Sequence, residues 1–397
     1  MDNPTEQNER KVEDLPLHGI KAVEAAQGVA GPFCGRLLAA FGADVVKVER
    51  QPLGDWSRHI GPFLAGDNHA ESSALYLYNN TGKKSVLIDW ETDAGRDDLV
   101  SLVSKADILV EDWDLSYRKT SGLAVDRFAA ENPGLIDLCV TPFGLTGPYS
   151  GWKSTPIVQM ALGGYLSITG EPTEEPLMLP GRQPDYLAGL NAHNAVEIAL
   201  FQRDMTGVGQ LIEVSMIETL ANLHQITLEM DGAVRKRNGH RQSALSTRPF
   251  PPGLATLPAD DGYVTFGGGS PAIWEQLCLM IGSEDFFANS DIDDTTGFAK
   301  LLDDMEGLLK TWMKGRTKRE IFLEASRDWM LPVAPVQELD EVLADPQYND
   351  RGLFQEIDHP VAGKAVYPTL PFVAPGTTQT LGRAPLLGEH TEEILGR

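Results

Sequence analysis

The sequence predicts an α/β protein in which a large domain contains a parallel sheet and a second, smaller domain is α+β. Over the first 140 residues, short apolar runs alternate with helical patterns, the βαβα order of a parallel sheet covered by helices on both faces. From about residue 234 to residue 260 the chain becomes loop-like and includes the proline-rich segment RPFPPG at 248–253. At 397 residues, the chain is long enough for two such domains.

The elements of each domain follow from local patterns, taken in chain order. Short runs rich in valine, isoleucine and leucine predict strands at residues 22–25, 44–48, 85–88, 108–110, 135–140 and 210–214. Amphipathic or small-residue segments predict helices at residues 33–40, 93–105 and 185–203, and one that runs from after residue 214 to about 230. The smaller domain is expected to contain a strand at 263–266 and helices at 273–281, 297–313 and 318–329. The segment 331–336, with two prolines, then leads back to extended and short helical pieces.

The acidic composition limits the partners of the chain. A formal net charge of −24 opposes binding to nucleic acid and to anionic membrane surfaces. The sequence contains no run of about 20 apolar residues, so no membrane span is expected.

Residues 1–14 are polar and acidic, which predicts a disordered tail rather than a signal peptide. Cys34, Cys139 and Cys278 lie far apart in apolar surroundings, so we expect reduced, buried thiols, no metal site and a cytoplasmic location.

One carboxylate stands where a long helix of small residues begins. Asp185 follows Pro184 and precedes Tyr186, and the helix then continues through several alanines. At this place the carboxylate faces unpaired N–H groups and the positive end of the helix dipole, which favours the ionised form that a nucleophile needs. The structural alternative is that Asp185 caps the helix, a role that contributes about 1 kcal/mol.

Four separated motifs span nearly the whole chain. They are VAGPFCGRLL at 29–38 with FGADVVKVER at 41–50, NNTGKKSVLID at 79–89, DYLAG at 185–189 with TGVGQ at 206–210, and RAPLLGEHT at 383–391. In order and in spacing, these motifs resemble those of the family III CoA-transferases, which include formyl-CoA transferase and carnitine CoA-transferase.

The resemblance implies a set of site residues. An aspartate at the position of Asp185 attacks the acyl-CoA thioester in that family. Val29 lies in a turn that contacts CoA, although formyl-CoA transferase has a glutamine there, so the role of that glutamine is absent or moved. Arg50 matches an arginine that packs on the CoA adenine, and Lys83 matches a lysine near the nucleotide. The pair Asp112 and Trp113 stands where the family places a CoA-contacting pair.

The resemblance also implies substrates and architecture. Acyl-CoA and a small carboxylic acid would be the substrates, with no metal and no tightly bound cofactor. Residues 15–225 and 335–397 would form a Rossmann-like large domain, and residues 226–334 a small domain with its linkers. Two chains would interlock as a homodimer.

Three other functions are alternatives to CoA transfer. An α-methylacyl-CoA racemase needs a second acid–base group, and related racemases use a histidine upstream of the aspartate. Here no histidine occurs between His69 and His193. A non-catalytic CoA-binding protein is the second alternative. A nicotinamide site at the turn after the first strand would need glycines where Ala30 and Phe33 stand.

Several further residues keep two interpretations. The basic cluster at 235–248 is either a solvated loop or a phosphate contact. Arg182 either pairs with an acceptor carboxylate or is an exposed loop arginine. We expect His193 to be a structural group within an apolar helix, His390 to anchor the C-terminal segment by local hydrogen bonds, and Gly267–Gly269 to be a turn.

Overall fold

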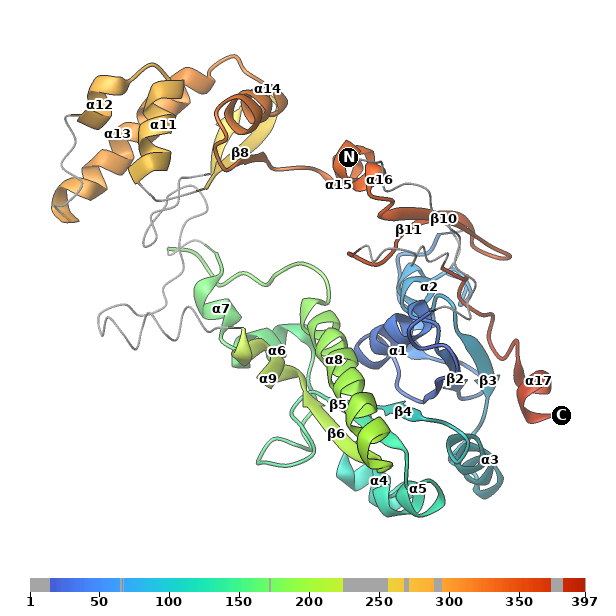
Figure 1. Cartoon of the computed structure of the whole chain (residues 1–397). Helices are drawn as coiled ribbons and strands as arrows, with labels where there is room; N and C mark the ends of the chain where they lie inside the picture. The colour runs from blue at the N-terminus through green and yellow to red at the C-terminus, as the bar shows by residue number, and fades with distance from the viewer. Residues whose placement is uncertain are drawn as a thin grey trace. The chain divides into compact units, whose positions relative to one another are not determined.

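The computed structural model describes most of the chain and divides it into two compact units (Figure 1). One unit comprises residues 1–165, 179–229 and 345–397, and the other comprises residues 166–178 and 230–344. The residues described are 15–64, 66, 68–170, 173–223, 256–267, 271–288, 295–372 and 381–396. The expected tail at 1–14, the basic cluster at 235–248 and most of the glycine triplet therefore lie outside the described residues.

A parallel sheet of six strands forms the centre of the first unit, as the sequence predicts. The strand order is β3-β2-β1-β4-β5-β6, and each neighbouring pair is parallel. The order changes direction between β1 and β4, so the loops that follow these two strands diverge at one edge of the sheet. The strands are β1 (Lys21–Glu24), β2 (Asp44–Glu49), β3 (Lys84–Leu87), β4 (Ile108–Glu111), β5 (Ile136–Thr141) and β6 (Gln210–Ser215).

Helices cover both faces of this sheet because successive strand residues point to opposite sides. Ala22 packs in the core with α1 (Ala30–Ala40) and α8 (Gln183–Thr206), whereas its neighbour Val23 packs in the core with α3 (Asp93–Val103) and α5 (Val125–Glu131). Figure 1 shows α1 and α8 side by side, and the two helices are in contact. Further short helices of this unit are η2 (Trp56–His59), α2 (Ala74–Asn79), α4 (Leu115–Ser121), α6 (Pro156–Leu162) and α9 (Met216–Asn222). The helix α7 (Tyr165–Ile168) starts at the last residue before the second unit and otherwise belongs to that unit.

The C-terminal part of the chain returns to the first unit. Its described elements are α16 (Pro346–Asp350), the antiparallel hairpin of β10 (Phe354–His359) and β11 (Gly363–Pro368), and α17 (Thr391–Leu395). Ile357 and Tyr367 of the hairpin are buried with Tyr76 and Leu77 of α2. The sequence predicts extended and short helical pieces here, and the structure resolves them into a hairpin and the short helices α16 and α17.

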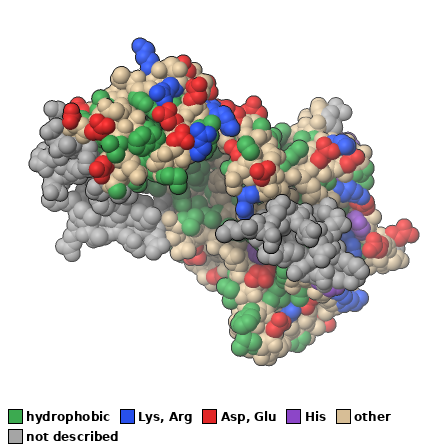
Figure 2. Space-filling model, turned by 45° about the horizontal axis from the view of Figure 1, so that its top comes forward, with side chains coloured by type: hydrophobic (Ala, Val, Ile, Leu, Met, Phe, Trp, Pro, Cys, Tyr) green, Lys and Arg blue, Asp and Glu red, His purple; other side chains and the backbone are tan. Residues whose placement is uncertain are grey.

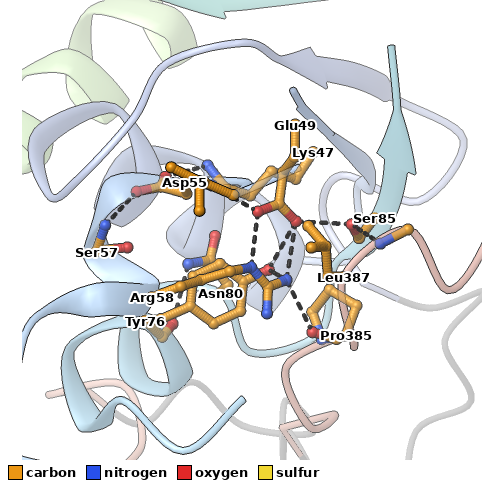
Figure 3. Close-up of polar contacts among 12 residues, drawn as sticks. Lys47, Glu49, Asp55, Ser57, Arg58, Tyr76, Asn80, Ser85, Pro385 and Leu387 are labelled. Carbon is orange, nitrogen blue, oxygen red and sulfur yellow. Dashed lines mark hydrogen bonds and ion pairs between the residues drawn. The ribbon is translucent and has the colours of Figure 1, made fainter. Parts of the chain in front are cut away.

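Buried charges tie the last motif to the sheet (Figure 3). The Arg58 guanidinium donates to both carboxylate oxygens of Glu49, at 2.8 and 2.9 Å, and to the Pro385 carbonyl at 3.3 Å. Ser85 accepts a backbone hydrogen bond from His390 N at 2.9 Å, and its own N–H donates to His390 Nδ1 at 3.2 Å. The expected anchoring role of His390 is therefore confirmed.

The second unit has a small antiparallel sheet and a helical layer. Its strands are β7 (Thr256–Ala259), β8 (Gly262–Phe266) and β9 (Val333–Pro335), in the order β7-β8-β9. Its helices are α11 (Pro271–Met280), α12 (Glu284–Ala288), α13 (Thr295–Met313), α14 (Lys318–Phe322) and α15 (Leu339–Ala344). The single helix expected at 318–329 is wrong in detail, because α14 passes at residue 323 into a π-helical segment.

One glycine sets the spacing between α1 and α8. A Cβ atom at Gly189 would lie 2.5 Å from the Ala30 carbonyl oxygen and 3.2 Å from the Phe33 Cβ. Only a residue without a side chain allows the two backbones to approach so closely. This approach brings the first turn of α8, which carries Asp185, next to the start of α1.

Replacing Gly189 with alanine is expected to destabilise the protein by about 1–3 kcal/mol, because a backbone oxygen cannot move aside as a side chain can. That loss exceeds the gain in helix propensity of about 1 kcal/mol. Urea unfolding of Gly189→Ala measures the change. Gly151→Ala is the matched control, since its Cβ would meet nothing within 4 Å. Equal stability of the two variants would contradict this interpretation of the packing.

Candidate active site

The loops that follow β1 and β4 form one side of the candidate site. The N–H of Gln27, just after β1, donates to Asp112 Oδ2 at 3.1 Å, just after β4. Val29 follows in the same turn as the N-cap residue of α1 and is buried. In open α/β sheets, ligands bind in the crevice where the strand order reverses. The structure thus joins Asp112 to the turn that carries Val29, and these are two of the residues that the resemblance assigns to CoA binding.

A buried ion network holds this turn. Lys47 Nζ lies 2.9 Å from Glu24 Oε1 and 2.7 Å from Asp55 Oδ2, and all three side chains are fully buried. The same ammonium donates to the Ala26 carbonyl at 2.9 Å, and Asp55 accepts from the Gly28 N–H with both oxygens. Despite the burial, Asp55 and Glu24 hold the pKa of Lys47 above its ordinary value. The ammonium of Lys47 and the carboxylate of Asp55 therefore hold the backbone at Ala26 and Gly28 in place through hydrogen bonds.

Lys83 belongs to the same network. Its buried Nζ lies 2.7 Å from Glu24 Oε2 and donates to the Pro32 carbonyl at 2.7 Å and to Asn80 Oδ1 at 2.9 Å. Burial lowers the pKa of Lys83 to about 8, against the opposing charge of Glu24. In the structure as it stands, this lysine supports the start of α1 from inside, and its contact with CoA stays a prediction.

Asp185 lies in the first turn of α8 and does not cap it. The N-cap residue is Arg182, and no side chain caps this helix. The residue is buried, and its Oδ2 atom has no hydrogen-bond partner among the described residues. The capping alternative is therefore wrong, because the carboxylate accepts no hydrogen bond from the backbone of its own helix.

The environment of Asp185 shifts its acidity. Burial raises the pKa of Asp185 to about 6, and the nearby charge of Arg182 opposes this rise. The helix dipole favours the ionised form of this carboxyl, whereas burial disfavours it. With a pKa of about 6, the group is roughly nine-tenths ionised at neutral pH. A partly desolvated carboxylate of this kind is more basic than an ordinary aspartate.

Trp56 and Arg182 cover the site. The sequence did not point to Trp56, and it left two interpretations open for Arg182. The ring of Trp56 lies over the turn, since a Cβ at Gly28 would come within 2.0 Å of it. The Arg182 guanidinium carbon lies 4.8 Å from the centre of the Trp56 ring. The structure thus places Trp56 between the turn at Gly28 and the side chain of Arg182. No local pattern marks Trp56, because its contact depends on how the loop after β2 folds back.

The remaining predicted CoA residues, Arg50 after β2 and Trp113 after β4, both lie next to Trp90. Arg50 is half-exposed, pairs with Glu91 at 2.7 Å and packs 5.3 Å from the Trp90 ring centre. Trp113 is buried in the core, where its ring contacts Trp90 and Phe128. The geometry leaves Arg50 open to a ligand and Trp113 enclosed, and both assignments stay predictions.

His193 occupies a buried position further along α8. Its ring packs 5.3 Å from Phe41, and its Nε2 atom lies 3.5 Å from Glu197 Oε1. Burial lowers the pKa of His193 to about 4, so the ring is neutral at physiological pH. These contacts favour the structural interpretation.

On the face shown in Figure 2, acidic, basic and apolar side chains are interspersed. All three cysteines are buried and none forms a disulfide. No helix among the described residues has the length and apolar character needed to cross a membrane. Within that same part of the chain, no cluster of three or more His, Cys, Asp or Glu side chains could hold a metal ion.

Comparison with known proteins connects this geometry to a family. A family model described as CoA-transferase family III matches residues 17–391. The chain is 30% identical to the succinyl-CoA:(R)-benzylsuccinate CoA-transferase subunit BbsE of Thauera aromatica, over 93% of this chain and 91% of the relative. It is also 30% identical to the succinate–glutarate CoA-transferase of Agrobacterium fabrum, over 96% and 95% of the two chains. The crystal structure of a CAIB/BAIF family protein from Brucella suis superimposes with a TM-score of 0.81 at 29% identity, covering 96% of this chain and 99% of that one.

The raised pKa of Asp185 predicts a pH-dependent cost in stability. A carboxyl whose pKa is higher in the folded state binds its proton more tightly there, so its ionised form destabilises the fold above about pH 6. Asp185→Asn removes the charge and should be more stable than the parent at about pH 7.5, by on the order of 2–3 kcal/mol.

Thermal unfolding of both proteins between about pH 4 and pH 8 measures this difference. We expect the advantage of Asp185→Asn to shrink as the pH falls through 6 and to vanish near 4, where both states of the parent are protonated. A difference that does not change with pH would mean that the carboxylate is not desolvated.

Proposed function

Since the chain belongs to CoA-transferase family III, we propose that it moves CoA from an acyl-CoA donor to a carboxylic acid through covalent intermediates on Asp185. The family match covers residues 17–391. One observation supports the choice of nucleophile above the others. The buried Oδ2 of Asp185 has no hydrogen-bond partner among the described residues, although it lies where α8 approaches the turn after β1.

The proposed reaction begins with attack by an Asp185 oxygen on the thioester carbonyl of the donor. The C–S bond breaks, CoA leaves as the thiolate, and a mixed anhydride forms. The thiolate then attacks the carbonyl carbon of Asp185, which releases the donor acid as its carboxylate and leaves an aspartyl-CoA thioester. No proton is gained or lost over these two steps, and no metal or redox group takes part in them.

The acceptor acid repeats the two steps in reverse. Its carboxylate attacks the aspartyl thioester and expels CoA thiolate, and the thiolate then attacks the acceptor carbonyl to free Asp185. Each tetrahedral intermediate carries an oxyanion. The first turn of α1 has N–H groups without partners inside the helix, and these donors suit that charge. Exclusion of water preserves the energy of the thioester, which agrees with the burial of Asp185.

The contacts with CoA form part of the proposal. Arg50 is half-exposed, and a planar guanidinium suits stacking on the adenine. Val29 and Asp112 would line the crevice beside the acyl-CoA. We keep Lys83 and Trp113 in the set, and since both are buried, direct contact with CoA would need their present partners to move. The half-exposed guanidinium makes Arg50 the best supported of these contacts.

A dicarboxylic acid is the first substrate to test. The two relatives named above act on succinyl-CoA or succinate according to their names. We therefore choose succinyl-CoA as the first donor, with a panel of carboxylic acids as acceptors read by mass spectrometry.

Trapping the intermediate tests the assignment of Asp185. Succinyl-CoA and hydroxylamine are added to the enzyme, and peptides are analysed by mass spectrometry. An acyl or thioester group on Asp185 is converted to a hydroxamate, so the peptide that contains residue 185 should carry this mark. Asp185→Asn should show no mark and lose transfer by several orders of magnitude, with CoA binding retained.

Two outcomes would contradict the proposal. Transfer that proceeds while another residue carries the hydroxamate would reassign the nucleophile. Incorporation of solvent deuterium at the α-carbon of a 2-methylacyl-CoA, without transfer, would instead support a racemase.

Self-association is a further part of the proposal. Ile198, Phe201 and Met205 follow one another at helical spacing on α8 and are 69%, 70% and 73% exposed. A row of large apolar side chains on one helix face marks a surface for a partner. A second copy of the chain is the partner that the family resemblance favours, and a homodimer follows from it.

A charge in this row should weaken the dimer. We expect Phe201→Glu to shift the species seen by analytical ultracentrifugation from dimer to monomer. Gln202→Glu is the control, because it adds the same charge at the neighbouring exposed position. A parent protein that sediments as a monomer would overturn the dimer, and unchanged association of Phe201→Glu would exclude this face.

A cytoplasmic location completes the proposal. Cys34, Cys139 and Cys278 are buried and none is in a disulfide, as expected for a protein of a reducing compartment.

A further inference from the structure

The partly exposed guanidinium of Arg182 lies beside Asp185. Its Nη1 atom lies 3.6 Å from Asp185 Oδ2, which is an ion pair too long for a hydrogen bond. The carbon of the same group lies 4.8 Å from the Trp56 ring centre. Among the described residues, Asp185 is the one ion-pair partner of this guanidinium, and Asp185 Oδ2 itself has no hydrogen-bond partner there. The side chain is 31% exposed, so N–H donors of this guanidinium are open to solvent or to a ligand beside the nucleophile.

The proposed reaction changes the charge that Arg182 faces. In the resting enzyme Asp185 is an anion, and the ion pair is balanced. Once Asp185 carries an acyl group or CoA, its carbonyl is neutral, and the positive charge of Arg182 has no counterion in the site. At the same stage a free carboxylate must either leave the site or enter it. A planar guanidinium binds a carboxylate with two parallel hydrogen bonds, which a lone ammonium cannot do.

We propose that Arg182 binds the reacting carboxylate of the substrate acid, and that it becomes available for this only after Asp185 has been converted to its anhydride or thioester. The inference rests on the proposed nucleophile. It makes acid binding depend on the covalent state of the enzyme: free acids are rejected by the charge of resting Asp185 and accepted once that charge is gone. The stacking contact with Trp56 keeps the guanidinium at the site in both states.

The other charged and titratable groups around this end of α8 are already engaged. Tyr186 packs against Phe33 and accepts a hydrogen bond from Asn79 Nδ2 at 3.4 Å, and Arg36 of α1 packs over Tyr78 at 4.4 Å. Asp55 and Lys47 are paired with each other beneath the turn. Among the described residues, Arg182 is the group whose charge lowers the pKa of Asp185. Arg182 is thus the cation that both controls the nucleophile and can receive an acid.

Equilibrium binding of succinate at about pH 7.5 tests the inference without turnover, because Asp185→Asn mimics the neutral, modified state. We expect Asp185→Asn to bind succinate roughly 10- to 100-fold more tightly than the parent enzyme does, the range for a hydrogen-bonded charge pair. The double variant Asp185→Asn/Arg182→Gln should lose this gain. Equal affinity of parent and Asp185→Asn, or a gain that survives in the double variant, would overturn the inference.

Kinetics of the single variants supply the second readout. In Arg182→Gln, the acidic limb of the succinyl-CoA-dependent labelling of Asp185 should move to higher pH, because the opposing positive charge is lost. KM for the acceptor acid should rise roughly 10-fold or more, with KM for the acyl-CoA nearly unchanged, and Arg182→Lys should recover part of the loss. Arg127→Gln is the control, since that arginine pairs with Asp97 at 2.9 Å on the exposed helices α3 and α5.

The two proposals fail in different ways. Absence of label on Asp185 in the parent enzyme would remove the nucleophile and, with it, this inference. A normal label on Asp185, together with an unchanged acidic limb and an unchanged acceptor KM in Arg182→Gln, would remove the role of Arg182 alone. If Arg182→Gln does not fold, circular dichroism shows it, and the acceptor KM of Arg182→Lys decides the question in the same way.

Discussion

The buried ammonium of Lys47, held between Glu24 and Asp55, is the interaction on which the site depends. It joins the end of β1 to β2 and to the loop before Trp56, and it fixes the carbonyl of Ala26 directly. Breaking a buried pair of this kind costs about 3–5 kcal/mol, because the remaining charge stays in a medium that solvates it poorly. The backbone of the turn before α1 is consequently held rigid. The helix α8 packs closely against the start of α1 at Gly189. This rigidity gives Asp185 a defined position next to the start of α1.

The buried ion network beneath the turn before α1 and the ion pair of Asp185 and Arg182 above it differ in how completely their charges are satisfied. Beneath the turn, the carboxylates of Glu24 and Asp55 are balanced by the ammonium groups of Lys47 and Lys83 at distances below 3 Å. Above it, Asp185 Oδ2 lies 3.6 Å from Arg182 Nη1 and has no hydrogen-bond partner among the described residues. A fully satisfied pair stabilises a fold, whereas an incompletely satisfied pair keeps its reactivity. Such a carboxylate costs stability at neutral pH, which is an expected trade-off at a catalytic position.

The sequence predicted the parallel sheet, the helices on both of its faces and the placement of Asp185 near a helix start, because apolar periodicity and the Pro184-Asp185 pair are local signals. It did not predict how Trp56 covers Gly28 or how Asp55 reaches that turn. Both contacts arise because the loop after β2 folds back over the loop after β1, and no spacing in the sequence encodes this return. The capping alternative for Asp185 failed because α8 begins earlier than that role requires. Arg182 is the N-cap residue, and Asp185 lies three residues later, inside the first turn. Similarly, the contacts that enclose Lys83 and Trp113 come from strands and helices far apart in the chain.

Oxygen transfer from substrate to Asp185 tests the central claim most directly. In the proposed mechanism, the acceptor carboxylate forms the bridging oxygen of an anhydride, and thiolate attack on the acceptor carbonyl leaves that oxygen on Asp185. A single turnover with an acceptor acid labelled with 18O in its carboxylate should therefore place one 18O atom in the side chain of Asp185, found by mass spectrometry of the peptide that contains it. Complete transfer of CoA with no 18O in that peptide would contradict the account.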